Sequence, residues 1–61
     1  MGHLIFKHED ENAVYVYNRK KELLGKITFY MDWNEFVFEP EIAMIFSQGC
    51  LHEIQEKMLQ L

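Results

Sequence analysis

Hydrophobic and polar side chains alternate with a period of two along much of the chain before Pro40, a pattern typical of β-strands with one buried face. The alternation is clearest at Phe36 and Phe38, which lie between two glutamates. β-Branched and aromatic residues, which pack well on a pleated surface, dominate the other stretches. The sequence therefore predicts strands at residues 4–6, 13–17, 24–31 and 35–39.

The segments between these strands are short and polar, as turns between antiparallel strands usually are. Residues 9–12 form an acidic, turn-like segment, residues 18–22 have the length of a charged hairpin connection, and residues 32–34 form another turn. Gly25 lies near the start of a predicted strand and indicates a β-bulge there. Pro40 cannot donate a hydrogen bond to a neighbouring strand, so we expect the last strand to end at it.

The C-terminal part of the chain has the periodicity of an amphipathic helix instead. Ser47 is a suitable N-cap residue, and the residues after it predict a helix from about Gln48 to the end of the chain. Residues 41–46 are apolar but irregular and are interpreted as a connection. Apolar side chains recur on the helix at intervals of three and four and form one stripe, which comprises Leu51, Ile54, Met58 and Leu61. We therefore expect a single α+β domain over residues 1–61, with a small antiparallel sheet of three to four strands and one C-terminal helix packed on one face.

The alternation sorts the strand residues into two faces of the sheet. The side chains assigned to the core beneath the helix are Val14, Val16, Ile27, Phe29, Met31, Phe36 and Phe38. Those assigned to the opposite face are Tyr15, Tyr17, Thr28, Tyr30 and Val37, with Lys26, Glu35 and Glu39 beside them. This second face is unusually aromatic for a sheet surface in contact with water, and one short helix can cover only the first.

The composition of the chain also indicates more apolar side chains than one helix and one sheet face can bury. A chain of 61 residues has room for one core, and at this size folding buries only about 60% of the surface of the unfolded chain. Hydrophobic residues nevertheless make up 49% of the chain and aromatic residues 15%. The single cysteine, Cys50, cannot form an internal disulfide, and no set of residues has the spacing of a structural zinc site. We expect the surplus apolar side chains to be buried by very efficient packing or against another chain.

The charge and the compartment can also be inferred from the sequence. A formal net charge of −4 does not favour overall attraction to phosphate backbones. No stretch approaches the length of about 18 apolar residues that crossing a bilayer requires, and the start of the chain is too short for a signal-peptide core. A lone free thiol fits a reducing compartment. These features predict a cytoplasmic protein that does not associate with membranes.

The residues that most resemble a catalytic pair are Cys50 and His52. Positions two apart on a helix point in nearly opposite directions, so we interpret Cys50 as a small, partly buried packing residue. His3 and His8 do not combine with these two residues at any familiar metal-ligand spacing. The carboxylates lie in the predicted turns and strands of a domain too small to hold a catalytic cleft. We therefore predict that the protein is not an enzyme and binds no metal or cofactor.

The order of several short motifs in the second half of the chain is familiar. Leu24-Gly25-Lys26-Ile27 is followed by Trp33, then by Phe36-Val37-Phe38-Glu39-Pro40, and finally by Phe46-Ser47 with Cys50-Leu51 and Ile54. In this order and spacing, residues 24–61 resemble very small uncharacterised proteins of bacterial phages, prophages and mobile elements. The resemblance implies a bacterial or phage setting and a sheet followed by a helix. That family has no established activity, so the resemblance implies no catalytic residue.

The aromatic face of the predicted sheet favours a protein-binding role, because association would bury it. The partner is either a second copy of the chain, which would give a homodimer, or a bacterial host factor. Trp33 either adds an anchor, since tryptophan is enriched at interface hot spots, or caps one end of the core. The predicted partner-binding residues are Tyr15, Tyr17, Tyr30, Trp33 and Val37.

Two alternative functions depend on charge. Aromatic residues on a sheet beside a basic loop can stack single-stranded bases, which would give Arg19, Lys20 and Lys21 a role in nucleic-acid binding. Glu35 and Glu39 on the same face, and the acidic chain as a whole, argue against this role. The acidic surplus could instead imitate DNA phosphates, although a charge of −4 over 61 residues is small for such a mimic.

Overall fold

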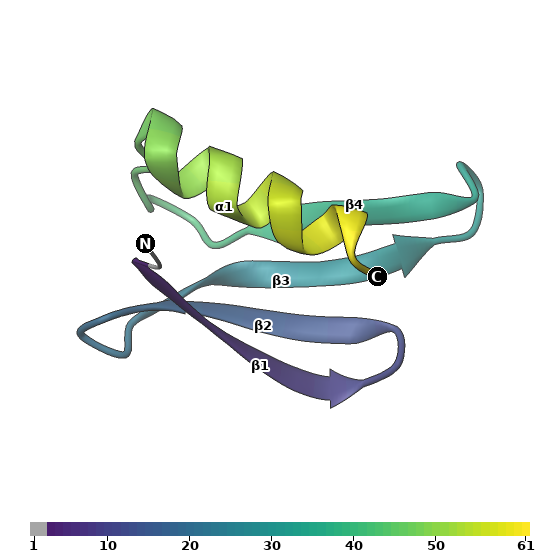
Figure 1. Ribbon diagram of the computed structural model, residues 1–61, viewed down its shortest axis with the longest axis horizontal. Helices are drawn as coiled ribbons and strands as arrows, with labels where there is room; N and C mark the ends of the chain where they lie inside the picture. The colour runs from purple at the N-terminus through teal and green to yellow at the C-terminus, as the bar shows by residue number, and fades with distance from the viewer. Residues whose placement is uncertain (1–2) are drawn as a thin grey trace.

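The structure is a computed structural model that describes residues 3–61. Within these residues, four strands form one antiparallel sheet in the order β1-β2-β3-β4, so each strand pairs with its neighbours in the sequence. A helix, α1, follows the sheet (Figure 1). The elements are β1 (Leu4–Asp10), β2 (Ala13–Asn18), β3 (Leu23–Tyr30), β4 (Glu35–Pro40) and α1 (Gln48–Leu59). The predicted α+β arrangement is therefore confirmed.

The strands are joined by tight connections in which polar side chains satisfy backbone amides. In the β2–β3 connection, Oδ1 of Asn18 accepts hydrogen bonds from the amides of Lys20 and Glu22, both at 2.9 Å. Lys21 in the same turn and Asn34 in the β3–β4 turn have left-handed backbones, with φ values of 67° and 54°. Asn tolerates this region better than most residues, which is one reason the β3–β4 turn forms where it does.

β1 is longer than the strand predicted at residues 4–6, and it includes two residues of the predicted acidic turn. It continues through Asp10, so only residues 11–12 form the turn to β2. The two strands pair along this whole length, with one irregularity in register between His8 and Asp10. The charged half of β1 lies at the edge of the sheet, where charged side chains discourage pairing with other chains.

The core lies between the sheet and the helix. Its buried side chains are Val14, Val16, Leu24, Ile27 and Ile54, and the partly buried ones packed against them are Leu4, Phe6, Phe36, Phe38, Phe46 and Met58. Phe29 is half-buried, and its ring meets that of Phe36 edge-on with 5.2 Å between centroids. The prediction that Met31 belongs to the core is wrong: β3 ends at Tyr30, and Met31 lies in the following turn with 82% of its surface exposed.

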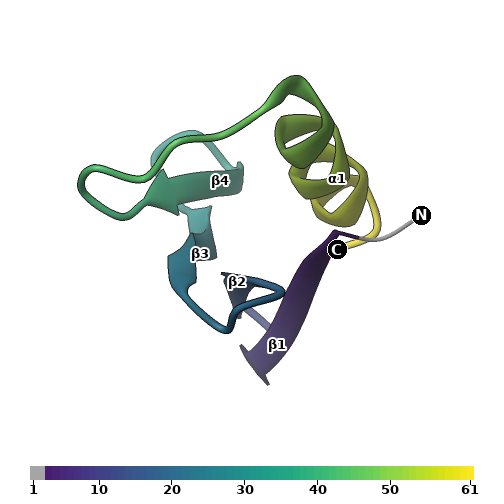
Figure 2. The same ribbon diagram turned by 90° about the vertical axis from the view of Figure 1, so that its left-hand side faces the viewer.

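The bulge predicted near Gly25 is confirmed. The register shifts between Val16, which pairs with Gly25, and Tyr17, which pairs with Leu23. Leu24 is the extra residue of β3 and is buried in the core. A bulge of this kind bends a strand and increases its twist. It therefore helps the sheet to curve around the helix, as Figure 2 shows.

The helix begins where the sequence predicts. Ser47 has the extended backbone of an N-cap residue, and its Oγ accepts a hydrogen bond from the amide of Cys50 at 3.1 Å. At the other end the helix stops at Leu59, before the last residue of the chain. No helix in the described part of the chain has the length and apolar character that crossing a bilayer requires.

The predicted apolar stripe of α1 is only partly buried. Ile54 is the buried helix residue and Met58 is half-buried, whereas Leu51 is 51% and Leu61 is 37% exposed. The contact between the helix and the sheet is therefore narrow, and it centres on one side chain. Figure 2 shows α1 on a single face of the sheet, on the inside of its curve.

Polar contacts attach the helix to β1 as well. The carboxylate of Glu53 accepts hydrogen bonds from the amide of His3 at 2.9 and 3.0 Å and from the amide of Leu4 at 3.2 Å. One turn further along, Nζ of Lys57 lies 5.6 Å from the centroid of the Phe6 ring. These contacts join the first strand to the last element of the fold.

Candidate binding surface

The face of the sheet that points away from α1, called the outer face below, is not covered by any described element (Figure 2). Strand pairing places alternate residues of the four strands on it in adjacent rows. Its members are Ile5, Lys7, Asp10, Ala13, Tyr15, Tyr17, Leu23, Lys26, Thr28, Tyr30, Val37 and Glu39. Glu35 pairs with Tyr30, but its side chain lines a pocket on the inner side of the sheet, so the prediction that it lies on the outer face is wrong. The predicted partner-binding residues of the strands, Tyr15, Tyr17, Tyr30 and Val37, therefore share one face.

The aromatic residues of the outer face differ in their exposure. Tyr15 and Tyr17 in β2 are half-buried by neighbouring side chains, and Tyr30 at the end of β3 is 40% exposed. Trp33 follows in the β3–β4 turn and is 66% exposed. Its ring meets that of Tyr30 edge-on, with 4.8 Å between centroids. The structure thus joins Trp33 to the aromatic face and leaves its indole in contact with solvent rather than at the end of the core.

One row across the outer face carries most of its charge. Lys7 pairs with Tyr15, Tyr15 with Lys26, and Lys26 with Glu39, so these residues cross the sheet from β1 to β4. Nζ of Lys26 lies 6.0 Å from the centroid of the Tyr15 ring, a cation–π distance. The β1 side of the row is therefore positive and the β4 side negative.

The basic hairpin at the end of β2 contributes only one residue to a hollow on this side. A shallow pocket of about 440 Å³ is lined by Ile5, Phe6, Lys7, Tyr17 and Lys21. Arg19 and Lys20, the other basic residues predicted to bind nucleic acid, are exposed in the β2–β3 turn. The structure therefore brings Lys21 and Tyr17 together, and it adds Lys7, which the sequence reasoning missed.

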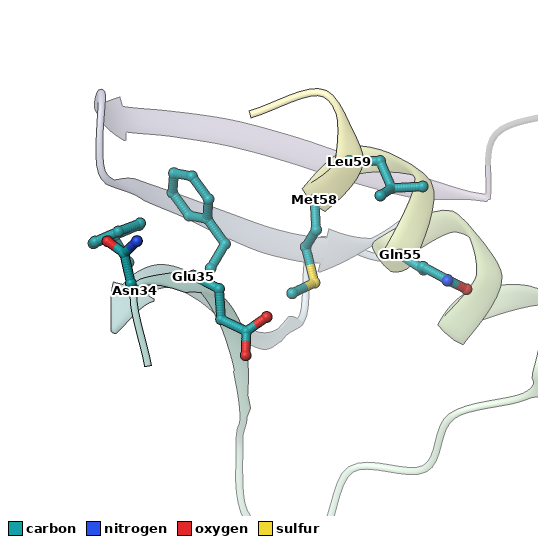
Figure 3. Close-up of a pocket in the computed structure, with 7 residues that line it drawn as sticks. Asn34, Glu35, Gln55, Met58 and Leu59 are labelled. Atoms are coloured by element: carbon teal, nitrogen blue, oxygen red, sulfur yellow. The ribbon is translucent and has the colours of Figure 1, made fainter. Parts of the chain in front are cut away.

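A second pocket, of about 410 Å³, lies on the inner side of the sheet between α1 and the β3–β4 end (Figure 3). Its lining residues are Phe29, Asn34, Glu35, Phe36, Gln55, Met58 and Leu59. Met58 extends from the helix toward the strand that carries Glu35 (Figure 3). Glu35 is the one titratable residue in this lining, so the pocket offers no pair of groups for acid–base chemistry.

The residues considered for chemistry do not form a cluster. Cys50 is half-buried, in agreement with its predicted packing role, and His52 is exposed beside Glu56 with 3.9 Å between Nε2 and Oε2. Among residues 3–61, no group of three or more His, Cys, Asp or Glu side chains lies close enough together to hold a metal ion.

The sequence reasoning missed Lys7 because it ended the first strand at residue 6, and it missed Ile5 because it assigned no residue of that strand to either face. The signal was present, since Leu4, Phe6 and His8 alternate with Ile5 and Lys7 in the same period of two that identified the other strands. It also missed two of the most exposed apolar side chains, Ile42 at 94% and Ile45 at 92%, which lie in the connection between β4 and α1. Comparison with protein-family models, curated proteins and solved structures finds no significant match to this chain.

Proposed function

We propose that this protein is a small non-catalytic binding module that docks onto a protein partner through its outer face. The observation that carries this proposal is the absence of any described element over that face, although it bears three tyrosines and continues into Trp33. Aromatic side chains of this kind supply most of the binding energy in many protein interfaces. The partner is either a second copy of the chain or a bacterial host factor.

The distribution of residues also resembles that of an interface. Tyr15 lies centrally on the outer face, Tyr17 lies toward its β2–β3 turn, and Lys7 and Glu39 lie on the two edge strands. Transient interfaces commonly have an aromatic centre and a charged rim. The resemblance of residues 24–61 to small phage, prophage and mobile-element proteins supports a bacterial or phage setting, in the cytoplasm.

Site-specific photo-crosslinking tests this proposal. A photoreactive phenylalanine analogue replaces Tyr30 in one variant and Leu59 in another, and each variant is irradiated in bacterial cytosol. Leu59 is a matched control because it is 74% exposed and lies on α1, away from the outer face. We expect a discrete crosslinked protein from position 30 and none from position 59.

The crosslinked protein is then purified and titrated with this chain. We expect the Tyr17→Ala, Tyr30→Ala double variant to bind about tenfold more weakly or worse, since interface aromatics are frequent hot spots. The Leu59→Ala variant should bind like the original chain. Equal binding by all three, with circular dichroism showing that each is folded, would exclude the outer face as the docking surface.

Single-stranded nucleic acid is a second candidate partner, favoured by the cation–π pair of Lys26 and Tyr15 and by the pocket that joins Tyr17 to Lys21. Bases would stack on the tyrosines while lysines contact phosphates. Glu39 in the same row opposes this, because it repels phosphate at the β4 side. The protein-docking proposal is therefore preferred.

A titration with an unbiased pool of single-stranded oligonucleotides at low salt separates the two candidates. Nucleic-acid binding predicts an affinity that falls steeply with salt. It also predicts weaker binding by the Lys20→Ala, Lys21→Ala double variant, with the Lys57→Ala variant on the helix as the control. An absence of binding at low salt excludes this candidate.

A further inference from the structure

We infer that the partner that fits the outer face is a second copy of this chain, placed face to face by a two-fold axis that runs along the strands between β2 and β3. The inference rests on the outer face being the docking surface proposed above. It is carried by the row of Lys7, Tyr15, Lys26 and Glu39, whose order across the sheet is complementary to itself.

The two-fold operation decides which residues of this row would meet. An axis parallel to the strands keeps each residue at the same height but exchanges the β1 side of one sheet with the β4 side of the other. Lys7 of one copy then faces Glu39 of the second copy, and Tyr15 faces Lys26. Both contacts occur twice, as they must in an interface with two-fold symmetry.

Charge also disfavours the other simple face-to-face arrangement. A two-fold axis that runs across the strands along this row would place Lys7 over Lys7 and Glu39 over Glu39. Like charges at these positions repel and suppress that pairing. Within one chain, Lys7 and Glu39 cannot pair directly, because three strand spacings separate them by about 14 Å.

The shape of the sheet fits a contact centred on β2 and β3. The sheet bends around α1, as Figure 2 shows. We therefore expect the outer faces of two copies to approach most closely at their middle strands. Tyr15, Tyr17 and Thr28 are the residues there, and the flexible side chains of Lys7 and Glu39 extend across the wider gap at the rim. Packed sheets cross at about 30°, which moves the end of the row by only about 4 Å.

The size of the face predicts weak association. It measures about 20 Å along the strands and about 19 Å across them, so it lies at the small end of specific interfaces. We expect a dimer that forms at micromolar concentration or above.

A charge exchange between two chains tests the arrangement. In the Lys7→Glu variant, both rim contacts of a homodimer become Glu against Glu, and in the Glu39→Lys variant both become Lys against Lys. We expect each variant alone to self-associate about tenfold more weakly than the original chain in sedimentation equilibrium. An equimolar mixture of the two variants restores opposite charges at both contacts and should recover the original affinity.

Mixing the two variants tests contacts between chains. A homodimer of either variant has like charges at both contacts between residue 7 and residue 39, and only the heterodimer has opposite charges there. The heterodimer is detected by titrating isotope-labelled Lys7→Glu protein with unlabelled Glu39→Lys protein and following the amide signals of Tyr15 and Lys26. Recovery in the mixture, with shifts confined to the outer face, supports the inference. The Lys57→Glu variant, changed on the helix, is the control and should self-associate like the original chain.

Two results overturn the inference. A chain that stays monomeric up to millimolar concentration rejects self-association, while the photo-crosslinking experiment still decides whether the outer face docks onto another protein. A chain that dimerises, but whose two charge variants do not recover affinity on mixing, rejects the two-fold arrangement through this row. Both results differ from a failure of the docking proposal itself. If that proposal failed, positions 30 and 59 would give the same crosslinking result.

Discussion

The ring of Phe38 lies directly against Gly25 on the neighbouring strand, where a side chain would leave it no space. A Cβ atom at position 25 would lie 2.6 Å from Cζ of Phe38 and 2.6 Å from the backbone oxygen of Glu39. Atoms of unbonded groups do not approach this closely, so the ring and the backbone would have to move together. The glycine thus allows the aromatic core to close over the bulge in β3.

We predict that the Gly25→Ala substitution lowers the free energy of unfolding by about 1 to 3 kcal/mol, the usual cost of overpacking a core. Urea denaturation followed by circular dichroism measures the change. Gly49→Ala is the matched control, since its nearest neighbour would be Oγ of Ser47 at 3.8 Å. In the helix this second substitution should stabilise by about 0.5 to 1 kcal/mol, and an equal loss in both variants would contradict the role of Phe38.

Glu53 joins elements at opposite ends of the chain. Its carboxylate accepts hydrogen bonds from the amides of His3 and Leu4, so its removal leaves two backbone donors without these partners. We predict that Glu53→Ala destabilises the fold by about 1 to 2 kcal/mol. Amide hydrogen exchange should speed up at Leu4 more than at the middle of β3.

Glu56→Ala provides the comparison for Glu53. Glu56 lies 3.9 Å from His52, and both side chains are more than half exposed, at 58% and 71%. Exposed pairs of this kind contribute little, so we expect a change below about 0.5 kcal/mol. Similar losses at both glutamates would indicate a general effect of helix charge rather than the contact with β1.

Ile54 is the side chain on which the packing of the helix depends. It is 3% exposed among the buried valines and isoleucine of the sheet, whereas Leu51 one turn earlier is 51% exposed. We predict a loss of about 2 to 4 kcal/mol for Ile54→Ala and less than about 1 kcal/mol for Leu51→Ala. Thermal unfolding of the two variants gives the comparison, and the reverse order would mean that the helix rests on its other side.

Trp33 reports directly on the outer face because it is the only tryptophan of the chain. Its indole is 66% exposed and touches the ring of Tyr30, so its fluorescence should be that of a solvated indole and should be quenched readily by acrylamide. We predict that Trp33→Phe changes stability by less than about 0.5 kcal/mol. A blue-shifted emission that resists quenching in dilute protein would contradict the exposed position.

The sequence correctly indicated features that depend on a few neighbouring residues. The period of two separated Val14 and Val16 from Tyr15 and Tyr17, and the structure places these pairs on opposite faces. Such alternation is readable because successive side chains on a strand must point to opposite sides. The N-cap at Ser47 is equally local, since its hydroxyl oxygen and the amide it satisfies are three residues apart.

The same reasoning failed where an element ends or where distant elements meet. β1 runs through Asp10 because β2 supplies hydrogen bonds along its length, which its own charged residues do not reveal. Met31 follows the alternation of β3 in sequence, but the turn to β4 begins there and exposes it. Ile54 is buried and Leu51 is exposed because of the orientation of α1 on the sheet. No local sequence pattern specifies that orientation.

Local residue patterns were thus enough to identify the type of each element and, apart from Met31, most of the strand residues of the core face, because backbone geometry fixes the direction of successive side chains. The alignment of Lys7, Tyr15, Lys26 and Glu39 in one row, in contrast, became visible only from the pairing of the four strands. That row depends on strand register, which in this sheet is set by the lengths of three turns and by a bulge at Gly25. Register arises from pairing between strands, and a shift of a single residue would turn the same side chains to the other face.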